Sequence, residues 1–188
     1  MDAELKFKDT SYAAAAPAAA GTITNSSLVL VTQGTGQSER IGRNLTVAGI
    51  SIQGAVRLPS NALPGLTYNS DRVRVLLYLD TQANGAAATP GLLLTPTVLD
   101  GHYNPVEQDR FTILDESTAQ LSHQAGDTRF AENVHSFALE FYGDEIPIEY
   151  SGTAGVLTEL RSNNIGVLRI SDNADATVSY EARVYYYG

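Results

Sequence analysis

The stretch that decides the fold is residues 177–187, which read TVSYEARVYYY. Every second position, from Val178 through Tyr180, Ala182 and Val184 to Tyr186, carries an apolar or aromatic side chain, whereas the positions between them are mostly polar. Strict alternation is typical of a β-strand with one face in a core and the other in solvent. We therefore expect a half-buried strand here.

Similar alternation occurs upstream. In residues 44–58 the apolar parity changes at Ala48-Gly49, which predicts a β-bulge with one extra residue. In residues 72–80 both faces carry apolar side chains, which indicates a central strand covered on both sides. Residues 134–141 alternate again, and we place Leu77 and Phe137 in the core. Shorter strands are expected at 4–12, 110–115, 146–150 and 164–171.

These segments make about eight strands, separated by turn residues such as Asn84-Gly85 and Asp172-Asn173. No window shows a convincing helical period. The predicted fold is all-β: an eight-stranded antiparallel jelly roll of two packed four-stranded sheets with long loops. The long connections, at 13–43, 81–109 and 116–133, are of a length that usually serves function or contacts.

The chain has 188 residues, which suits one domain, so we expect a single jelly-roll domain over 1–188. Within it, 1–21 is expected to hold an N-terminal strand and an Ala-rich connection, because Pro17 would break a helix in Ala13–Gly21. The start lacks a signal-peptide pattern and no segment is apolar enough to span a membrane, so we expect a soluble protein with no membrane partner.

The residue types exclude several kinds of chemistry. With 0 Cys the chain has no disulfide, zinc-thiolate site or thiol nucleophile. The three histidines, His102, His123 and His135, lack metal-ligand spacing, and there is no G-x-S-x-G elbow or phosphate-binding loop. We therefore expect no enzyme and no cofactor.

Exposed acids offer one further possibility for a metal. Asp144, Glu145 and Glu149, and separately Asp172 and Asp175, supply the hard oxygens that Ca²⁺ prefers. Calcium between subunits would offset carboxylate repulsion, while the alternative is a solvated acidic loop.

Four blocks of sequence carry a family resemblance. They are Gln33–Arg43 (QGTGQSERIGR) followed by Ile50–Gly54 (ISIQG); Asp71–Asp80 (DRVRVLLYLD) with Asn84-Gly85; Arg110–Asp115 (RFTILD); and Ile146–Tyr150 (IPIEY) with Arg161–Gly166 (RSNNIG). In this order, and with the closing strand, they resemble the capsid proteins of circular Rep-encoding single-stranded DNA (CRESS DNA) viruses. The resemblance covers most of residues 4–187.

The resemblance implies a coat subunit that assembles with many copies of itself into a small icosahedral shell around single-stranded DNA, located in the virion. It places candidate subunit contacts at Arg40, Arg43, Arg161, Asn163 and Asn164, although Asn163-Asn164 is equally explained by a turn. Arg72 and Arg74 are a candidate basic patch. Tyr185, Tyr186 and Tyr187 would either form an interface belt or cap the last strand.

The chain departs from that family in its charge. Members carry an Arg/Lys-rich N-terminal arm, whereas residues 1–39 here hold only Lys6 and Lys8, and the net charge is -9. Packaging depends on cations that neutralise phosphates. We therefore expect shells largely empty of nucleic acid.

Two other functions fit the same fold, because a fold does not determine a function. One is a lectin-like or ligand-recognition module that forms no shell. The other is a cupin-like enzyme, for which the sequence lacks the histidine cluster.

Overall fold

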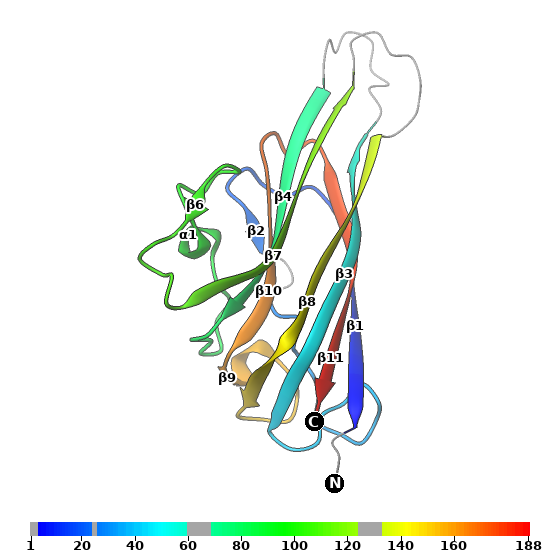
Figure 1. Ribbon diagram of the computed structural model, residues 1–188, viewed down its shortest axis with the longest axis vertical. Helices are drawn as coiled ribbons and strands as arrows, with labels where there is room; N and C mark the ends of the chain where they lie inside the picture. Colours follow the sequence, from blue (N-terminus) through cyan, green and yellow to red (C-terminus); the bar gives the residue numbers. More distant parts are fainter. Residues whose placement is uncertain (1–3, 24–25, 60–68, 124–132) are drawn as a thin grey trace.

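The protein consists of two packed antiparallel sheets, seen in the computed structural model of Figure 1, which describes residues 4–23, 26–59, 69–123 and 133–188. The first sheet, which we call sheet A, has the strand order β1-β11-β3-β8-β9, and sheet B has the order β2-β10-β4-β7. A two-stranded sheet, β5-β6, lies in a loop.

The elements have the following bounds: β1 Leu5–Ala15, β2 Thr22–Ile23, β3 Asn44–Leu58, β4 Asn69–Asp80, α1 Pro90–Leu93, β5 Leu94–Thr95, β6 His102–Tyr103, β7 Phe111–His123, β8 Asn133–Tyr150, the 3-10 helix η1 Leu157–Glu159, β9 Leu160–Ser162, β10 Asn164–Ser171 and β11 Thr177–Tyr187.

The strand order is that of a jelly roll. Leaving out β9 and the β5-β6 pair, the eight remaining strands pair first with last, second with seventh, third with sixth and fourth with fifth. This is the order of one long antiparallel hairpin rolled up into two sheets. The predicted all-β jelly roll of two packed antiparallel sheets is confirmed, although β9 makes sheet A five-stranded rather than four-stranded.

The predicted bulge in β3 is also confirmed. Val47 pairs with Tyr186 and Gly49 with Tyr185, so Ala48 is the extra residue, and Val47 and Ile50 both point into the core. Opposite it, β8 pairs through Ile146 and then through Tyr142. The residues between these two form a second bulge, in which Gly143 has a φ of 115°.

Three expectations about strands were wrong. Residues 146–150 are not a separate strand, because β8 continues through its bulge from Asn133 to Tyr150. The segment 116–133 is not wholly a connection, since β7 extends to His123. The strand β2 was missed, because two residues are too short to show alternation.

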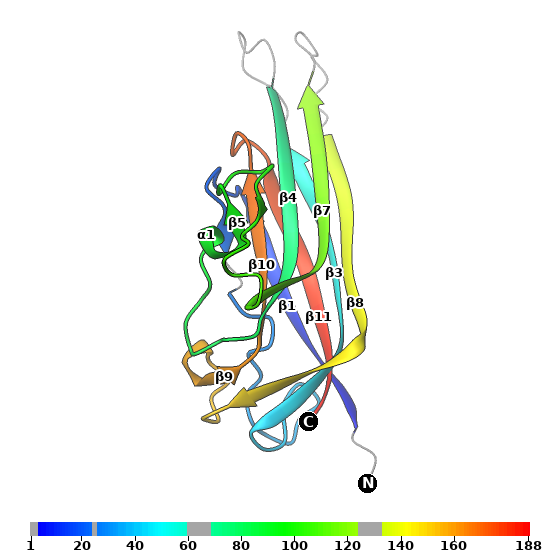
Figure 2. The same ribbon diagram turned by 60° about the vertical axis from the view of Figure 1, so that its left-hand side comes forward.

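The main core fills the space between the sheets, and Leu77, Val75 and Val184 are among its buried side chains. A second apolar cluster covers the opposite face of sheet B, where Leu76 and Tyr78 of β4 pack with Leu93 and Leu94. These last two belong to the segment 81–110, which we call the excursion, and Figure 2 shows its α1 and β5 beside β10 and β4. The prediction that β4 is covered on both sides is confirmed.

Candidate subunit-contact surface and internal charges

Arg40 lies inside the subunit, fully buried, rather than on a contact surface. Its guanidinium donates to the carbonyl oxygens of Val31, Gly42 and Gly152, and stacks on the Tyr150 ring at 4.1 Å. It therefore ties the loop before β3 to the loop after β8 at the end of the molecule that holds the C-terminus. The expectation that Arg40 contacts another subunit is corrected, because nothing of its side chain is accessible.

The pair Asn163-Asn164 forms a turn with internal bonds. Asn163 has a φ of 51°, a left-handed conformation that Asn tolerates, and its Nδ2 donates to the Pro147 carbonyl at 2.7 Å. Asn164 is buried, and its Nδ2 donates to the Ser26 carbonyl at 2.6 Å. Of the two explanations given above, the turn accounts for the observed geometry.

Arg43 and Arg161 are the two predicted contact residues that remain on the surface. Both are exposed, and neither side chain has a hydrogen bond or ion pair with any described residue. They lie on opposite sides of the end of β8, since the Arg43 carbonyl accepts from the Tyr150 amide and Tyr150 pairs on its other side with Leu160, the residue before Arg161. The prediction that they contact another subunit stays a prediction.

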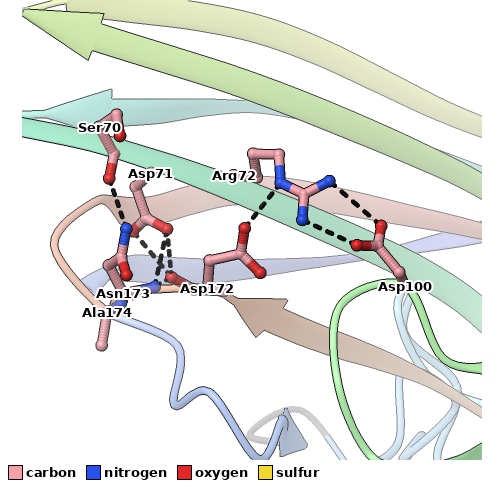
Figure 3. Close-up of polar contacts among 8 residues, drawn as sticks. Ser70, Asp71, Arg72, Asp100, Asp172, Asn173 and Ala174 are labelled. Carbon is pink, nitrogen blue, oxygen red and sulfur yellow. Dashed lines mark hydrogen bonds and ion pairs between the residues drawn. The ribbon is translucent and has the colours of Figure 1, made fainter.

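The candidate basic patch is an ion-pair network, in which Arg72 bridges two loops (Figure 3). Its Nε donates to Asp172 at 2.6 Å and its terminal nitrogens to Asp100 at 2.8 and 3.2 Å. These hydrogen bonds, with the nearby negative charges, raise the pKa of Arg72. Its positive charge is thus balanced twice within the subunit.

Arg74 is neutralised in a similar way. It donates to the Glu116 carboxylate at 2.7 Å, and Tyr103 donates to the same oxygen at 2.8 Å. Burial alone would raise the pKa of Glu116, but the hydrogen bonds from Arg74 and Tyr103 outweigh it and hold this pKa below its usual value. Together, Arg72 and Arg74 therefore do not form a basic patch.

Most other described cations are also held internally. Lys6 is buried and donates to the carbonyls of two residues in the loop before β3, and Lys8 donates to the Leu30 carbonyl. Burial lowers the pKa of Lys8. Further internal contacts are those of Arg110 with Asp80 at 2.8 Å, of Arg169 with Tyr12 at 2.6 Å and of Arg183 with Asp9 at 2.6 Å.

Two buried carboxylates were not predicted from the sequence. Asp71 accepts from the Ser171 hydroxyl and from the amides of Asn173, Asp175 and Ala176, which fixes the turn between β10 and β11 (Figure 3). Asp80 is fully buried and binds Arg110 through both oxygens, which closes the base of the excursion. A signal existed for Asp71, because it shares parity with the inward-facing apolar residues of β4.

The candidate metal ligands do not gather within one subunit. Among residues 4–23, 26–59, 69–123 and 133–188, no three His, Asp or Glu side chains are placed to hold a metal ion. Asp172 forms an ion pair with Arg72, whereas Asp144, Glu145 and Glu149 are exposed along β8. Calcium shared between subunits stays a proposal. His102 and His135 are exposed, and the side chain of His123 is outside the described residues.

The outer face of sheet A carries a row of aromatic rings, which we call the aromatic row: Phe7, Tyr185 and Tyr142. Phe7 pairs with Tyr185, Tyr185 with Gly49, and Gly49 with Tyr142, so all point to the same face. The Tyr142 ring occupies the space above Gly49 and is 56% exposed. Of the tyrosines at the chain end, Tyr186 faces the core and Tyr185 and Tyr187 face outward.

Within the part of the chain that the structure describes, no helix has the length and apolar character needed to cross a membrane. The hollows near the excursion and on sheet A are lined by the ion pairs already described and by apolar residues such as Phe111 and Ile113. No catalytic constellation is found among these described residues.

The fold defines the class of the protein: it is a double-sheet jelly roll, a class that includes viral coat proteins, lectins and cupins. The coat-protein branch is the one that comparison supports. Residues 3–187 match the satellite tobacco necrosis virus coat protein family, and the chain belongs to this family. No match was found among curated proteins.

Family membership makes this chain a viral capsid protein, located in the virion and structural in role, which fits a non-enzyme. The particular family differs from the one suggested by the sequence blocks. The match supports the expectation of a capsid protein but gives no support for CRESS DNA viruses or for single-stranded DNA as cargo.

Proposed function

We propose that this chain assembles with many copies of itself into a small icosahedral shell. The observation that carries the proposal is the extent of the family match, which spans residues 3–187 and thus every strand of both sheets. A jelly roll whose sheet A is uncovered on its outer face has surface available for contacts between copies.

Electron microscopy and sedimentation velocity of the purified chain test this proposal. We expect closed particles of uniform diameter that contain many copies. A monodisperse monomer at high concentration, across a range of salt and pH, would contradict the proposal.

We propose further that these shells do not package nucleic acid by charge. Nucleic-acid affinity rises with the number of phosphates that Lys and Arg neutralise. The chain has 12 basic against 21 acidic residues, and most described basic side chains are bound to carboxylates, carbonyls or a tyrosine of the same subunit. Little positive charge is left for phosphates.

The test is the ratio of absorbance at 260 and 280 nm on purified particles, followed by nuclease protection. We expect a protein-like spectrum. Near-stoichiometric protected nucleic acid would overturn the proposal, and separate digestion with DNase and RNase after disruption would then show whether the CRESS-type expectation of single-stranded DNA holds.

A further inference from the structure

The strongest unexplained surface feature is the pair Arg43 and Arg161. The other described arginines, including Arg40, Arg72, Arg74 and Arg183, all have partners within the subunit. Arg43 and Arg161 are exposed, flank the end of β8 in sheet A, and make no side-chain bond to any described residue. The end of sheet A therefore carries two guanidinium groups without partners among the described residues, one on each side of β8, with the exposed Glu149 of β8 between their strands.

A compact negative site lies elsewhere on the same sheet. Asp144 and Glu145 are both exposed in the β8 bulge, and the exposed ring of Tyr142 precedes them. None of the described cations forms an ion pair with either carboxylate. From this bulge to Tyr150, beside the two arginines, the strand extends by roughly 17 Å at its normal rise. The two sites are therefore too far apart to neutralise each other within one copy.

Two separated, complementary sites on one subunit suit a head-to-tail contact between copies. Such heterologous contacts generate closed assemblies when the rotation between copies closes. Copies with a net charge of -9 repel each other, so a stable contact has to place positive groups against negative ones. The aromatic row next to the bulge supplies apolar surface for the centre of the contact.

We propose that Arg43 and Arg161 of one copy bind Asp144 and Glu145 in the β8 bulge of a neighbouring copy. The occupant of both sites is thus a second copy of this chain. The inference rests on the proposed shell function, since it assigns the surface through which the shell forms.

Charge reversal tests the contact. The variant R43E/R161E makes each copy more negative by four charges, D144R/E145R makes it more positive by four, and the four-residue variant restores the original net charge. We expect each double variant to lower the particle yield at least tenfold, and the four-residue variant to recover most of it. Because all four residues are exposed, thermal unfolding of each variant should match the original chain.

The design separates the contact from bulk charge. If net charge alone limited assembly, D144R/E145R would assemble better than the original chain, which contradicts the proposal. If the original chain and both double variants form particles equally well, the contact is wrong while the shell function stands. If the original chain forms no particles, the shell function itself fails.

Two further outcomes would also overturn the contact. Intact R43E/R161E particles that lose bound nucleic acid would show that the arginines face the cargo. Loss of particles on chelation, with no effect of either reversal, would show that cations rather than arginines bridge the carboxylates.

Discussion

The two sheets of the molecule differ in what covers their outer faces. Sheet B is covered by the excursion, so that all eight residues of β10 are buried. On sheet A, no described element covers the outer face, and β11 alternates between buried core residues and more accessible outward ones. One sheet is therefore closed on both faces within the subunit, whereas the other leaves its outer face accessible.

The outward side chains of the two sheets reflect this difference. On sheet A they are polar or aromatic, and several bond to each other across neighbouring strands. Examples are the Asp9–Arg183 ion pair and the Ser11–Glu181 hydrogen bond at 2.6 Å. On sheet B, Leu76 and Tyr78 point out of the sheet into the second apolar cluster. If the excursion is an integral part of the fold, side chains on both faces of sheet B should contribute to stability, whereas those on the open face of sheet A should contribute little.

The largest effect is expected at neighbouring leucines of β4. Leu77 faces the main core and Leu76 faces the excursion, and both are fully buried. Replacing either with Ala should lower the free energy of unfolding by about 2–5 kcal/mol, through lost burial and a cavity. Phe137→Ala in the main core should fall in the same range. Equilibrium urea unfolding of the unassembled subunit measures these changes.

The comparison between the leucines is informative in itself. A change below about 0.5 kcal/mol for Leu76→Ala, beside a large change for Leu77→Ala, would mean that the excursion detaches before the sheets unfold.

A smaller effect is expected where the excursion is closed at its base. Asp80→Ala removes a buried carboxylate that binds Arg110 and accepts from the Gln82 amide at 3.1 Å. Because the Arg110 side chain is partly exposed, water can solvate it, and we expect a loss of about 1–3 kcal/mol. Limited proteolysis should then cut within the excursion first. Unchanged proteolysis would show that the apolar cluster alone holds the excursion in place.

The buried tyrosines predict how stability depends on alkaline pH. Burial raises the pKa of Tyr186 from 10.0 to about 12, and also raises that of Tyr78. Since the unfolded chain ionises at the lower pKa, this stabilisation is complete below pH 10 and is lost as the pH rises through the folded pKa. In a phenolate absorbance titration, Tyr186→Phe should remove a late-titrating group. If Tyr186→Phe instead removes a group that titrates near pH 10, the Tyr186 hydroxyl is accessible to solvent in the folded protein.

The smallest effect is expected on the open face of sheet A. A hydrogen bond from Arg183 lowers the pKa of Asp9, so any stabilisation is present above the unfolded pKa and is lost as the pH falls through the folded one. Exposed ion pairs contribute little at physiological salt. Asp9→Asn should therefore leave the thermal midpoint at pH 7 unchanged within error. A fall as large as that of Leu76→Ala would mean that this face is not open.

Several features followed from the sequence alone, because each rests on local periodicity. Alternation identified β3 and β11 with their bounds, and the parity change at Ala48-Gly49 located the bulge. Apolar residues on both faces of β4 indicated that both faces are covered by other parts of the chain. These inferences succeeded because a strand's faces alternate with a period of two residues wherever the strand pairs.

The partners of charged side chains were decided only by the tertiary structure. Arg40 and Arg43 are three residues apart in a single sequence block, yet one is buried among carbonyl oxygens and the other is exposed without a partner. The carbonyl groups around Arg40 come from loops more than a hundred residues apart in the chain. No local pattern contains that information, because the energy of a charge depends on the dipoles and charges that the fold brings around it.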